Sequence, residues 1–316
     1  MHTLQKLIGS AIALVLTMAP FATYAQGTAV GPGQDLFVTD GLAGTITRID
    51  PTTGADTPFA SGLPPALIGL GGVIDVAFIG GTAYALVTLV GADVGGSDTV
   101  GIYRIDGPAT STVIADIGQW SIDNPPSTPF DLPTGLQFSL HVYRGHFLVA
   151  DGHHNRVLEV GTDGAIDTFL EFGNVVPTGL EVWGDTVFVA LAGPTPHLPQ
   201  DGMVVSYNPG ASGPTLVASG APLAVDVARG RGGKFYVLSQ GIWNGQFPGS
   251  PALPNTGTLY EIRPDGSLRV VASNLNLPVS MEIIQNTAYV SSLAGTITEI
   301  HNIGGPPFGA RGRPLR

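Results

Sequence analysis

The chain contains no cysteine, and charged residues are scarce in it. Only 12% of the 316 residues are Asp, Glu, Lys or Arg, about half the usual share of ~25% in globular domains. The lack of cysteine excludes disulfide scaffolds, cysteine-ligated zinc, cysteine nucleophiles and lipid anchors on cysteine. The low charge argues against long helices that face solvent. Because glycine (45) and proline (26) are abundant, we expect many short elements joined by turns.

Positive charge is the scarcer sign. There are 13 Lys and Arg against 24 Asp and Glu, and the net charge is −11. Three of the arginines, Arg311, Arg313 and Arg316, lie in the Gly/Pro-rich C-terminal end. The rest of the chain is therefore strongly acidic and repels nucleic-acid phosphates and anionic membranes. We predict that the protein has no nucleic-acid partner.

Residues 1–25 have the pattern of a secretory signal peptide. Lys6 precedes an apolar run over residues 7–22, and small residues precede the cleavage point predicted after Ala25. We therefore predict a secreted or periplasmic protein. The alternative is an uncleaved membrane anchor, although the run is short for a span of ~20 residues. A second apolar stretch, residues 66–92, is interrupted by paired glycines and fits two buried strands, so we expect no membrane insertion after signal cleavage.

A short pattern of aromatic and β-branched residues recurs six times, and each copy is typical of a buried strand. The copies are centred on residues 37–38, 84–86, 147–149, 188–189, 236–238 and 289–290. After each copy comes a strand of strict apolar–polar alternation, which marks a half-buried strand. These strands cover residues 45–49, 102–105, 156–160, 203–207, 258–262 and 296–300.

Two further strands complete most units. Apolar first strands open near Gly72, Gly135, Gly179, Leu223 and Val279, with a weaker sixth candidate at residues 28–30. Fourth strands are clearest at residues 57–60, 216–218 and 270–272. Repeats of four antiparallel strands every ~40–60 residues are typical of propeller blades. A β-sandwich also has short alternating strands, but it does not require six copies of one strand pair. We predict an all-β, six-bladed β-propeller of four-stranded antiparallel blades over residues 26–302.

The two ends of the chain bear on how the ring closes. After Ile300 the chain runs into Gly304-Gly305-Pro306-Pro307, which is unsuited to a fourth strand. We predict that residues 26–31 supply the missing strand of the last blade, because closure by the N-terminal strand removes two sheet edges. The alternative is that this strand is absent. Residues 303–316 are predicted to be a disordered Gly/Pro/Arg tail.

The expected site lies on one face of the ring. Strands alternate in direction, so the loops after each second strand and the connections between units emerge on the same face. Three of these loops are long, at residues 90–100, 192–202 and 241–257. Loops on a rigid scaffold commonly carry binding sites. The mouth of the central channel on this face is therefore the predicted site. No Gly-x-Ser-x-Gly, P-loop or His-Glu-x-x-His motif supports those enzyme classes.

Asp151, His153 and His154 follow the third buried strand. A carboxylate beside imidazoles suits metal binding or general-base chemistry. The alternative is a tight turn in which Asp151 and Asn155 bond backbone amides and the histidines are solvated. Adjacent histidines point apart on an extended chain, so they rarely share a metal ion. We predict no metal site here.

Other candidates lie on the same face. Trp243 and Phe247, in the longest loop, form either a lid that stacks on a ligand or staples that hold the loop. Thr134, Thr178 and Ser280 stand at the entrances of first strands, where they present hydroxyls to the channel or simply form turns. No role is predicted for Trp120 and His197.

Four segments in order, residues 101–106, 114–120, 149–160 and 176–180, resemble the ScyD/ScyE family of secreted β-propellers. The resemblance implies a propeller fold and export, and it supplies no catalytic residues. The wider relatives are NHL-repeat and senescence-marker-type propellers. Lactonases of the latter type hold a divalent cation with a Glu and an Asn-rich quartet. Here Thr134 and Thr178 stand where Asn is expected, so the lactonase chemistry is not implied.

These observations predict an exported, soluble β-propeller that acts as a binding module without a cofactor. Its ligand, a small molecule or a protein, is not identified by the sequence. The alternative is a metal-assisted, lactonase-like hydrolase or lyase that acts on a small organic molecule in the central channel. That alternative requires a bound Ca²⁺ or similar cation, so metal analysis of the purified protein separates the two.

Overall fold

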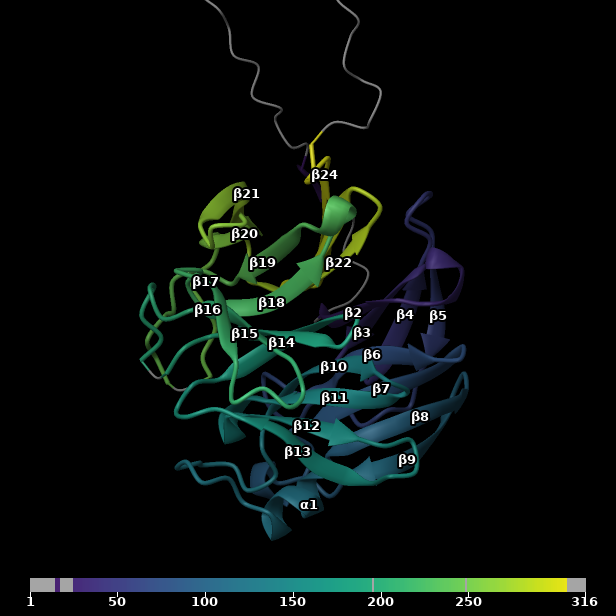
Figure 1. The fold of residues 1–316 in the computed structure, drawn as a ribbon. Coiled ribbons are helices and arrows are strands. Elements are labelled where there is room, and N and C mark those ends of the chain that lie inside the picture. The colour runs from purple at the N-terminus through teal and green to yellow at the C-terminus, as the bar shows by residue number, and fades with distance from the viewer. Residues whose placement is uncertain (1–14, 18–24, 195, 248, 306–316) are drawn as a thin grey trace, which may run out of the picture.

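The computed structural model describes residues 15–17, 25–194, 196–247 and 249–305. Its strands form six antiparallel four-stranded sheets arranged as the blades of a propeller (Figure 1). The first three blades are β2 (Ala25–Val30), β3 (Leu36–Asp40), β4 (Thr45–Ile49) and β5 (Asp56–Ala60); β6 (Gly72–Ile79), β7 (Thr82–Thr88), β8 (Gly101–Gly107) and β9 (Thr110–Asp116); and β10 (Gln137–Tyr143), β11 (His146–Asp151), β12 (Arg156–Val160) and β13 (Ile166–Glu171).

The second three blades continue in the same order. They are β14 (Pro177–Trp183), β15 (Thr186–Leu191), β16 (Met203–Tyr207) and β17 (Thr215–Ser219); β18 (Ala224–Arg229), β19 (Phe235–Ser239), β20 (Gly257–Ile262) and β21 (Leu268–Leu275); and β22 (Pro278–Ile284), β23 (Thr287–Ser292) and β24 (Thr296–His301), with β1 (Val15–Thr17) paired to β24. The predicted six-bladed, all-β fold is confirmed, and so are the predicted positions of the six second and six third strands.

The core lies in the seams between blades. The second strands are buried along nearly their whole length, as in β3, whose five residues are all buried. Third strands are half-buried, as in β4, where Ile46 packs in the seam between blades one and two, Ile49 packs in the seam between blades six and one, and Arg48 is exposed. Because each sheet packs both faces against its neighbours, the central strands become uniformly apolar. This is the pattern that identified the blades.

The predicted role of residues 26–31 is wrong. They lie in β2, which pairs with β3 and forms the innermost strand of the first blade, not the outer strand of the last. The physical reason is that every blade needs an inner strand at the channel, and residues 28–30 were only a weak candidate in the sequence. The strand that pairs with the outer edge of β24 is β1 (Val15–Thr17). The first and last blades lie side by side, with β2 packed against β22 (Figure 1).

The C-terminal boundary also differs from the prediction. Ile303 is 2% exposed and packs in the seam between blades five and six. The side chain of Asn286 accepts a hydrogen bond from the Gly304 amide and donates one to the Gly305 carbonyl, both at 2.8 Å. Residues 303–305 are therefore packed and hydrogen-bonded, whereas the prediction placed them in a disordered tail. Residues 306–316, and most of the predicted signal peptide, lie outside the described residues.

One α-helix, α1 (Ile117–Asp123), interrupts the strand pattern between blades two and three. Asp116 caps it, since its carboxylate accepts a hydrogen bond from the Gln119 amide at 2.8 Å. The described residues also form four single-turn 3₁₀ segments: η1 (Pro32–Gln34), η2 (Ala92–Val94), η3 (Gly152–His154) and η4 (Arg231–Gly233). Within the described ranges, no helix has the length and apolar character needed to cross a membrane.

Candidate functional site

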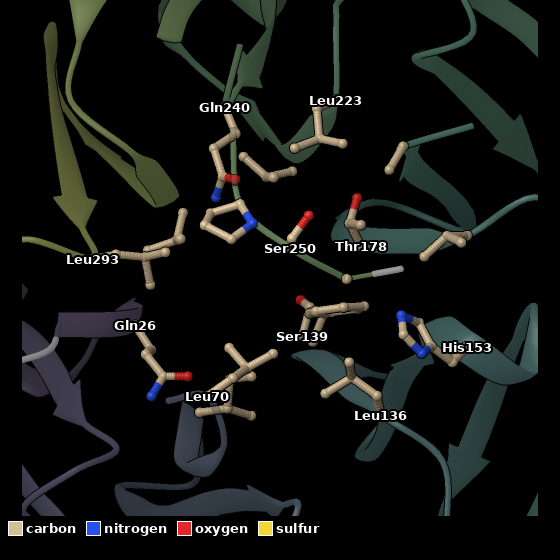
Figure 2. Close-up of a pocket in the computed structure, with 18 of the residues that line it drawn as sticks. Gln26, Leu70, Leu136, Ser139, His153, Thr178, Leu223, Gln240, Ser250 and Leu293 are labelled. Atoms are coloured by element: carbon tan, nitrogen blue, oxygen red, sulfur yellow. The ribbon is translucent and has the colours of Figure 1, made fainter. Parts of the chain in front are cut away.

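A cavity of about 410 Å³ opens at the mouth of the central channel, on the face that the sequence analysis selected. The starts of the inner strands, the ends of the second strands and the loops above them enclose it. Figure 2 shows the side chains in a ring around an open centre. We call this cavity the funnel.

The wall of the funnel is mainly apolar. The large aliphatic side chains that line it are Ile68, Leu70, Ile74, Leu89, Leu132, Leu136, Val176, Leu223, Val225, Val279 and Leu293. Phe247, which is 58% exposed, extends the apolar surface toward solvent. No Lys or Arg is among the described residues that line the funnel. Apolar walls with few polar groups are typical of sites for small organic molecules.

Two imidazoles face the funnel. Burial lowers the pKa of His153, and the nearby His197 lowers it further, so His153 is neutral at pH 7. Burial likewise lowers the pKa of His197, although the Ala192 carbonyl, 3.3 Å from its Nδ1, opposes that shift. A neutral imidazole offers one hydrogen-bond donor and one acceptor. The funnel wall above its floor therefore carries no net charge at neutral pH.

The floor is formed by a repeated arrangement of three residue types. In blades one to three the inner strands place Gly27, Asp75 and Ser139 around the channel, and blades four to six place Gly179, Asp226 and Ser280 there. A Cβ added to either glycine would collide with the aspartate of the next blade. The two halves of the ring thus repeat one packing solution, in which glycine makes room for a buried aspartate.

Each of these aspartates joins two blades. Asp75 accepts backbone N–H groups of Val76 at 2.8 Å and of Leu140 in the next blade at 2.7 Å. Asp226 makes the same pair of bonds with Val227 and Met281 at 2.8 and 2.7 Å. Burial nevertheless raises the pKa of Asp226 to about 7 and holds that of Asp75 well above its ordinary range. Desolvation of the charged form outweighs the hydrogen bonds.

Below this floor the channel continues as a polar cavity of about 280 Å³. Glu181, Glu282 and His141 line it together with the undersides of Asp75 and Asp226. Burial, followed by the neighbouring carboxylates, raises the pKa of Glu282 well above its ordinary range. His141 Nε2 lies 3.8 Å from a Glu181 carboxylate oxygen. The channel therefore changes from an apolar funnel to an acidic lower half at the two aspartates.

Three of the seven residues predicted from the sequence line the funnel, namely His153, Thr178 and Ser280. The Thr178 hydroxyl already donates to the Ala190 and Ala224 carbonyls, so it contributes mainly its methyl group. Ser280 contacts Thr28 across the seam between blades six and one, with 2.9 Å between the two hydroxyl oxygens. Of the three, His153 offers the most available polar atoms.

Asp151 and His154 lie outside the funnel in a buried network. Asp151 is 0% and Arg156 2% exposed, and Arg156 Nε donates to Asp151 at 2.9 Å. His154 Nδ1 lies 3.0 Å from the same carboxylate, and its Nε2 lies 2.8 Å from the Leu132 carbonyl. The expectation that both histidines are solvated is therefore wrong for His154. As expected of adjacent residues, His153 and His154 point to different surroundings.

The network ties α1 to the third blade. Arg156 donates to the Asn124 carbonyl at 2.7 Å and to the Ser121 hydroxyl at 3.0 Å, and its guanidinium lies 4.8 Å from the centre of the Trp120 ring. These two hydrogen bonds go to residues in or just after α1. The cluster therefore supports the wall of the funnel from behind.

Thr134 and Trp243 hold loops in place. The Thr134 amide and hydroxyl both donate to Asp93, at 3.2 and 2.5 Å. Trp243 pairs with Ala252 across the long loop and packs edge-on against His197, with 5.4 Å between ring centres. Trp243 thus acts as a staple, whereas Phe247 is the aromatic residue at the funnel mouth.

The sequence analysis missed Gln26, Asp75, His197, Asp226 and Gln240. Asp75 and Asp226 carried a readable signal, because each is an acid inside an otherwise apolar inner strand, flanked by Ile74 and Val76 or by Val225 and Val227. Such a residue in a buried strand is expected to need a specific partner. Gln26 and Gln240 carried no comparable signal. Among the described residues, no group of three or more His, Asp or Glu side chains is placed to hold a metal ion.

The comparisons with known proteins identify the fold. No family model matches the chain, and no curated protein matches it. Solved structures do match over 92% of this chain. They include the PQQ-bound aldose sugar dehydrogenase of Streptomyces coelicolor (15% identity, TM-score 0.63, 99% of that chain) and a gluconolactonase of Xanthomonas campestris (13%, 0.63, 89%). Virginiamycin B lyase of Staphylococcus aureus is also similar (12%, 0.55, 98%).

At these identities the likeness concerns the fold alone. The neighbours include gluconolactonases, which agrees with the wider group of propellers that the sequence resembles. They combine enzymes with a nidogen/laminin complex, so the fold does not select one activity. The specific resemblance to the ScyD/ScyE family is not confirmed and stays a prediction.

Proposed function

We propose that this propeller binds a small, uncharged and largely apolar organic molecule in the funnel. The observation that carries the proposal is the composition of the wall, in which aliphatic side chains predominate and neutral imidazoles and amides supply the polar atoms. An apolar ligand gains free energy by leaving water in such a cavity, whereas an anionic ligand would lose its hydration without a cationic partner among the described lining residues. The two aspartates of the floor already accept two backbone N–H groups each.

Two of the similar structures are described with a small molecule bound, PQQ in the sugar dehydrogenase and quinupristin in an inactive variant of the lyase. These are properties of those proteins. They support the proposal only in that propellers of this shape accommodate organic ligands.

The test is the binding of Nile red, an uncharged apolar dye, to the wild type and to a variant with a filled funnel. Val279 lines the funnel without using a side-chain hydrogen bond, so Val279→Trp occupies the cavity. Val113 lies on β9 and is 41% exposed, so Val113→Trp is the matched control outside the funnel. We expect saturable binding to the wild type and the control, and at least ~10-fold weaker binding to Val279→Trp. Equal binding to all three would refute the proposal.

A second candidate function is a hydrolase or lyase acting on a small organic molecule in the same funnel. The observation that favours it is His153, whose lowered pKa leaves an unprotonated ring nitrogen available as a general base at neutral pH. The sequence analysis described this alternative as metal-assisted, but the described residues provide no cluster of metal ligands.

Turnover of a panel of lactones and cyclic esters tests this candidate, with metal analysis of the same sample. An enzyme would lose activity in His153→Ala and keep it in His146→Ala, because His146 is exposed at the start of β11, the opposite end of that strand from His153. Stoichiometric bound Ca²⁺ would favour the metal-assisted form. Ligand binding without turnover would favour the binding protein.

We also propose that the protein is exported and that residues 1–25 are removed. This has a structural consequence, since β1 (Val15–Thr17) lies in the removed segment. The exported protein would have a three-stranded sixth blade, with β24 as its outer edge. Intact mass of the protein recovered outside the cytoplasm tests this, because a chain that retains Met1 would contradict cleavage. The finer assignment to the ScyD/ScyE family rests on the four sequence segments alone.

A further inference from the structure

The funnel wall contains one imidazole that makes no hydrogen bond within the described protein. His153 is partly exposed and packs edge-on against Phe138, with 6.1 Å between ring centres. Unlike the enclosed unpaired atoms elsewhere in the described structure, its two ring nitrogens keep accessible surface. In Figure 2 the ring points toward the open centre of the funnel. A molecule in the funnel can therefore reach a ring nitrogen of His153.

The other polar side chains among the described lining residues are already engaged. Each makes at least one hydrogen bond within the protein, as the Thr178 hydroxyl does with two backbone carbonyls. His197 uses its Nδ1 on the Ala192 carbonyl. Each of the remaining described histidines also has a hydrogen-bond or ion-pair partner. Because polar groups in protein interiors are normally paired, His153 is the side chain of the wall that is available to a ligand.

The turn that carries His153 is held on its far side. His154, the next residue, lies with its Nδ1 3.0 Å from the buried Asp151 carboxylate. Asn155 ends the turn in the left-handed conformation, at φ 56°, and its amide donates to the Gly152 carbonyl at 2.9 Å. A ligand group therefore meets an imidazole on a fixed backbone, which lowers the entropy lost on binding.

The charge state of the imidazole restricts which ligand group fits. Burial and then His197 lower the pKa of His153, and Asp151 and Asp131 only partly oppose this, so the ring is neutral at pH 7. A neutral imidazole has an unprotonated nitrogen that accepts a hydrogen bond. A hydroxyl group can donate to it, whereas an ether has no proton to donate. A carboxylate would find neither a charged imidazole nor a Lys or Arg among the described lining residues.

We propose that His153 determines the specificity of the funnel, and that its ligand is an uncharged, largely apolar molecule whose hydroxyl group donates a hydrogen bond to a ring nitrogen of His153. This inference rests on the proposed function and adds the chemical group that the funnel selects. It applies equally to the full chain and to a chain cleaved after Ala25, since His153 is far from both ends. A ligand without a hydroxyl leaves the nitrogen unpaired and binds more weakly.

The experiment is calorimetric titration of the full chain at neutral pH with three probes of similar shape: 2-naphthol, 2-methoxynaphthalene and the anionic 2-naphthoate. We expect the wild type to bind 2-naphthol most tightly, about 3- to 10-fold more tightly than the methoxy probe. The reason is that both probes fit the apolar wall, but only the naphthol donates a hydrogen bond.

Two variants locate the preference. His153→Phe keeps an aromatic ring that packs against Phe138 but has no ring nitrogen, so the preference for the hydroxyl probe should disappear. Thr178→Val is the matched change at another polar position of the wall. Its hydroxyl already donates to the Ala190 and Ala224 carbonyls, so its loss should change the affinities of all three probes alike and leave the preference intact.

The outcomes separate the two proposals. If neither Nile red nor any naphthalene binds, the proposed function fails. If the probes bind but His153→Phe keeps the wild-type preference, the role of His153 fails while the binding function stands. Tightest binding of 2-naphthoate would overturn the uncharged class. Should His153→Phe not fold, His153→Leu replaces it, and a wild type that does not prefer 2-naphthol overturns the inference without any variant.

Discussion

Arg156 is a cation enclosed between helix α1 and the third blade, and its side chain is 2% exposed. Its charge is matched by Asp151, which also accepts a hydrogen bond from Gln137 at 2.9 Å. Such a pair is costly to desolvate, and its net contribution to stability depends on every remaining donor and acceptor being used. Here the guanidinium also reaches Ser121 and the Asn124 carbonyl, which gives the pair a positioning role as well.

Replacing Arg156 by methionine should destabilise the protein by about 3–5 kcal/mol, because Asp151 would remain buried without its cation. Arg48→Met is the control, since Arg48 pairs with Asp35 but is 53% exposed, and exposed pairs contribute about 0–1 kcal/mol. Urea unfolding of both variants measures the difference. Similar midpoints for the two variants would show that the buried network is dispensable.

Asp226 predicts how stability depends on pH. Burial raises its pKa in the folded protein to about 7, and Asp75 and Glu181 lie in the same channel. Because the folded pKa exceeds the unfolded one, the folded state binds the proton more tightly. The contribution of Asp226 to stability is therefore fully present below about pH 4, decreases between pH 4 and 7 and stays low above pH 7.

Asp226→Asn removes this titration. The variant loses one acceptor for a backbone N–H at every pH, which adds a constant offset. Relative to the wild type, its free energy of unfolding should improve by about 1–4 kcal/mol between pH 4 and pH 7.5. Denaturant unfolding at several pH values gives the difference curve. A flat difference curve would contradict the raised pKa of Asp226.

At the scale of elements, hydrogen bonds within the loop over residues 241–257 hold its shape, and Trp243 anchors the loop to the blades. Trp243 packs with Val176, Ala192, Leu223 and Ala252, all behind or beside the funnel wall. A long loop without its own secondary structure is expected to open locally unless such contacts hold it. The funnel mouth, including Phe247, is therefore positioned indirectly by Trp243.

Trp243→Ala should increase the rate of proteolytic cleavage within residues 241–257 by about 10-fold while lowering the melting temperature only slightly. The matched control is Trp183→Ala, because Trp183 is 52% exposed at the end of β14. Limited proteolysis with mass mapping checks the result. If cleavage of the loop is equally fast in both variants, Trp243 is not its anchor.

Elements with a local signature were predictable from the sequence, and those set by distant partners were not. The half-buried character of β4 or β24 can be read from five or six consecutive residues. The cap of α1 was also readable, since Asp116 precedes Gln119 by three positions, yet the short helix was overlooked. By contrast, the place of β2 depends on its pairing with β3 and its packing against β22, which no local pattern specifies.

The candidate site was likewise predictable only in part. The face of the ring followed from strand direction, and the positions of His153, Thr178 and Ser280 followed from the repeat. The different surroundings of His153 and His154 did not follow from the repeat. The His154 imidazole contacts Arg156 and the carbonyl of Leu132, which lies in the connection before the third blade. Gln26 was assigned to the wrong blade, so its place in the funnel was missed as well.

For the whole molecule, the six seams are unequal. In the described structure the seam between blades six and one has five buried apolar residues, Leu36, Val38, Ile49, Tyr289 and Ile297. The other five seams have nine to thirteen. Hydrogen bonds partly replace the missing apolar contacts, since the Ser291 hydroxyl donates to the Gln26 carbonyl at 2.8 Å and Ser280 contacts Thr28.

A ring of blades that touch only their neighbours should open first where the least apolar area is buried. We therefore expect amides of β2–β4 and β22–β24 to exchange through local opening at a free energy at least ~1.4 kcal/mol below that of the remaining blades, a tenfold difference in the open population.

Two matched substitutions sharpen the test. Ile297→Ala removes a buried side chain from this seam, and Ile102→Ala removes one from the seam between blades two and three. Each should cost about 2–5 kcal/mol, but Ile297→Ala should accelerate exchange in blades six and one selectively, whereas Ile102→Ala should lower the stability of the whole ring. Hydrogen exchange followed by mass spectrometry resolves these segments. Uniform protection across all six blades, or equal patterns for the two variants, would mean that the hydrogen bonds across the closing seam compensate fully for its smaller apolar core.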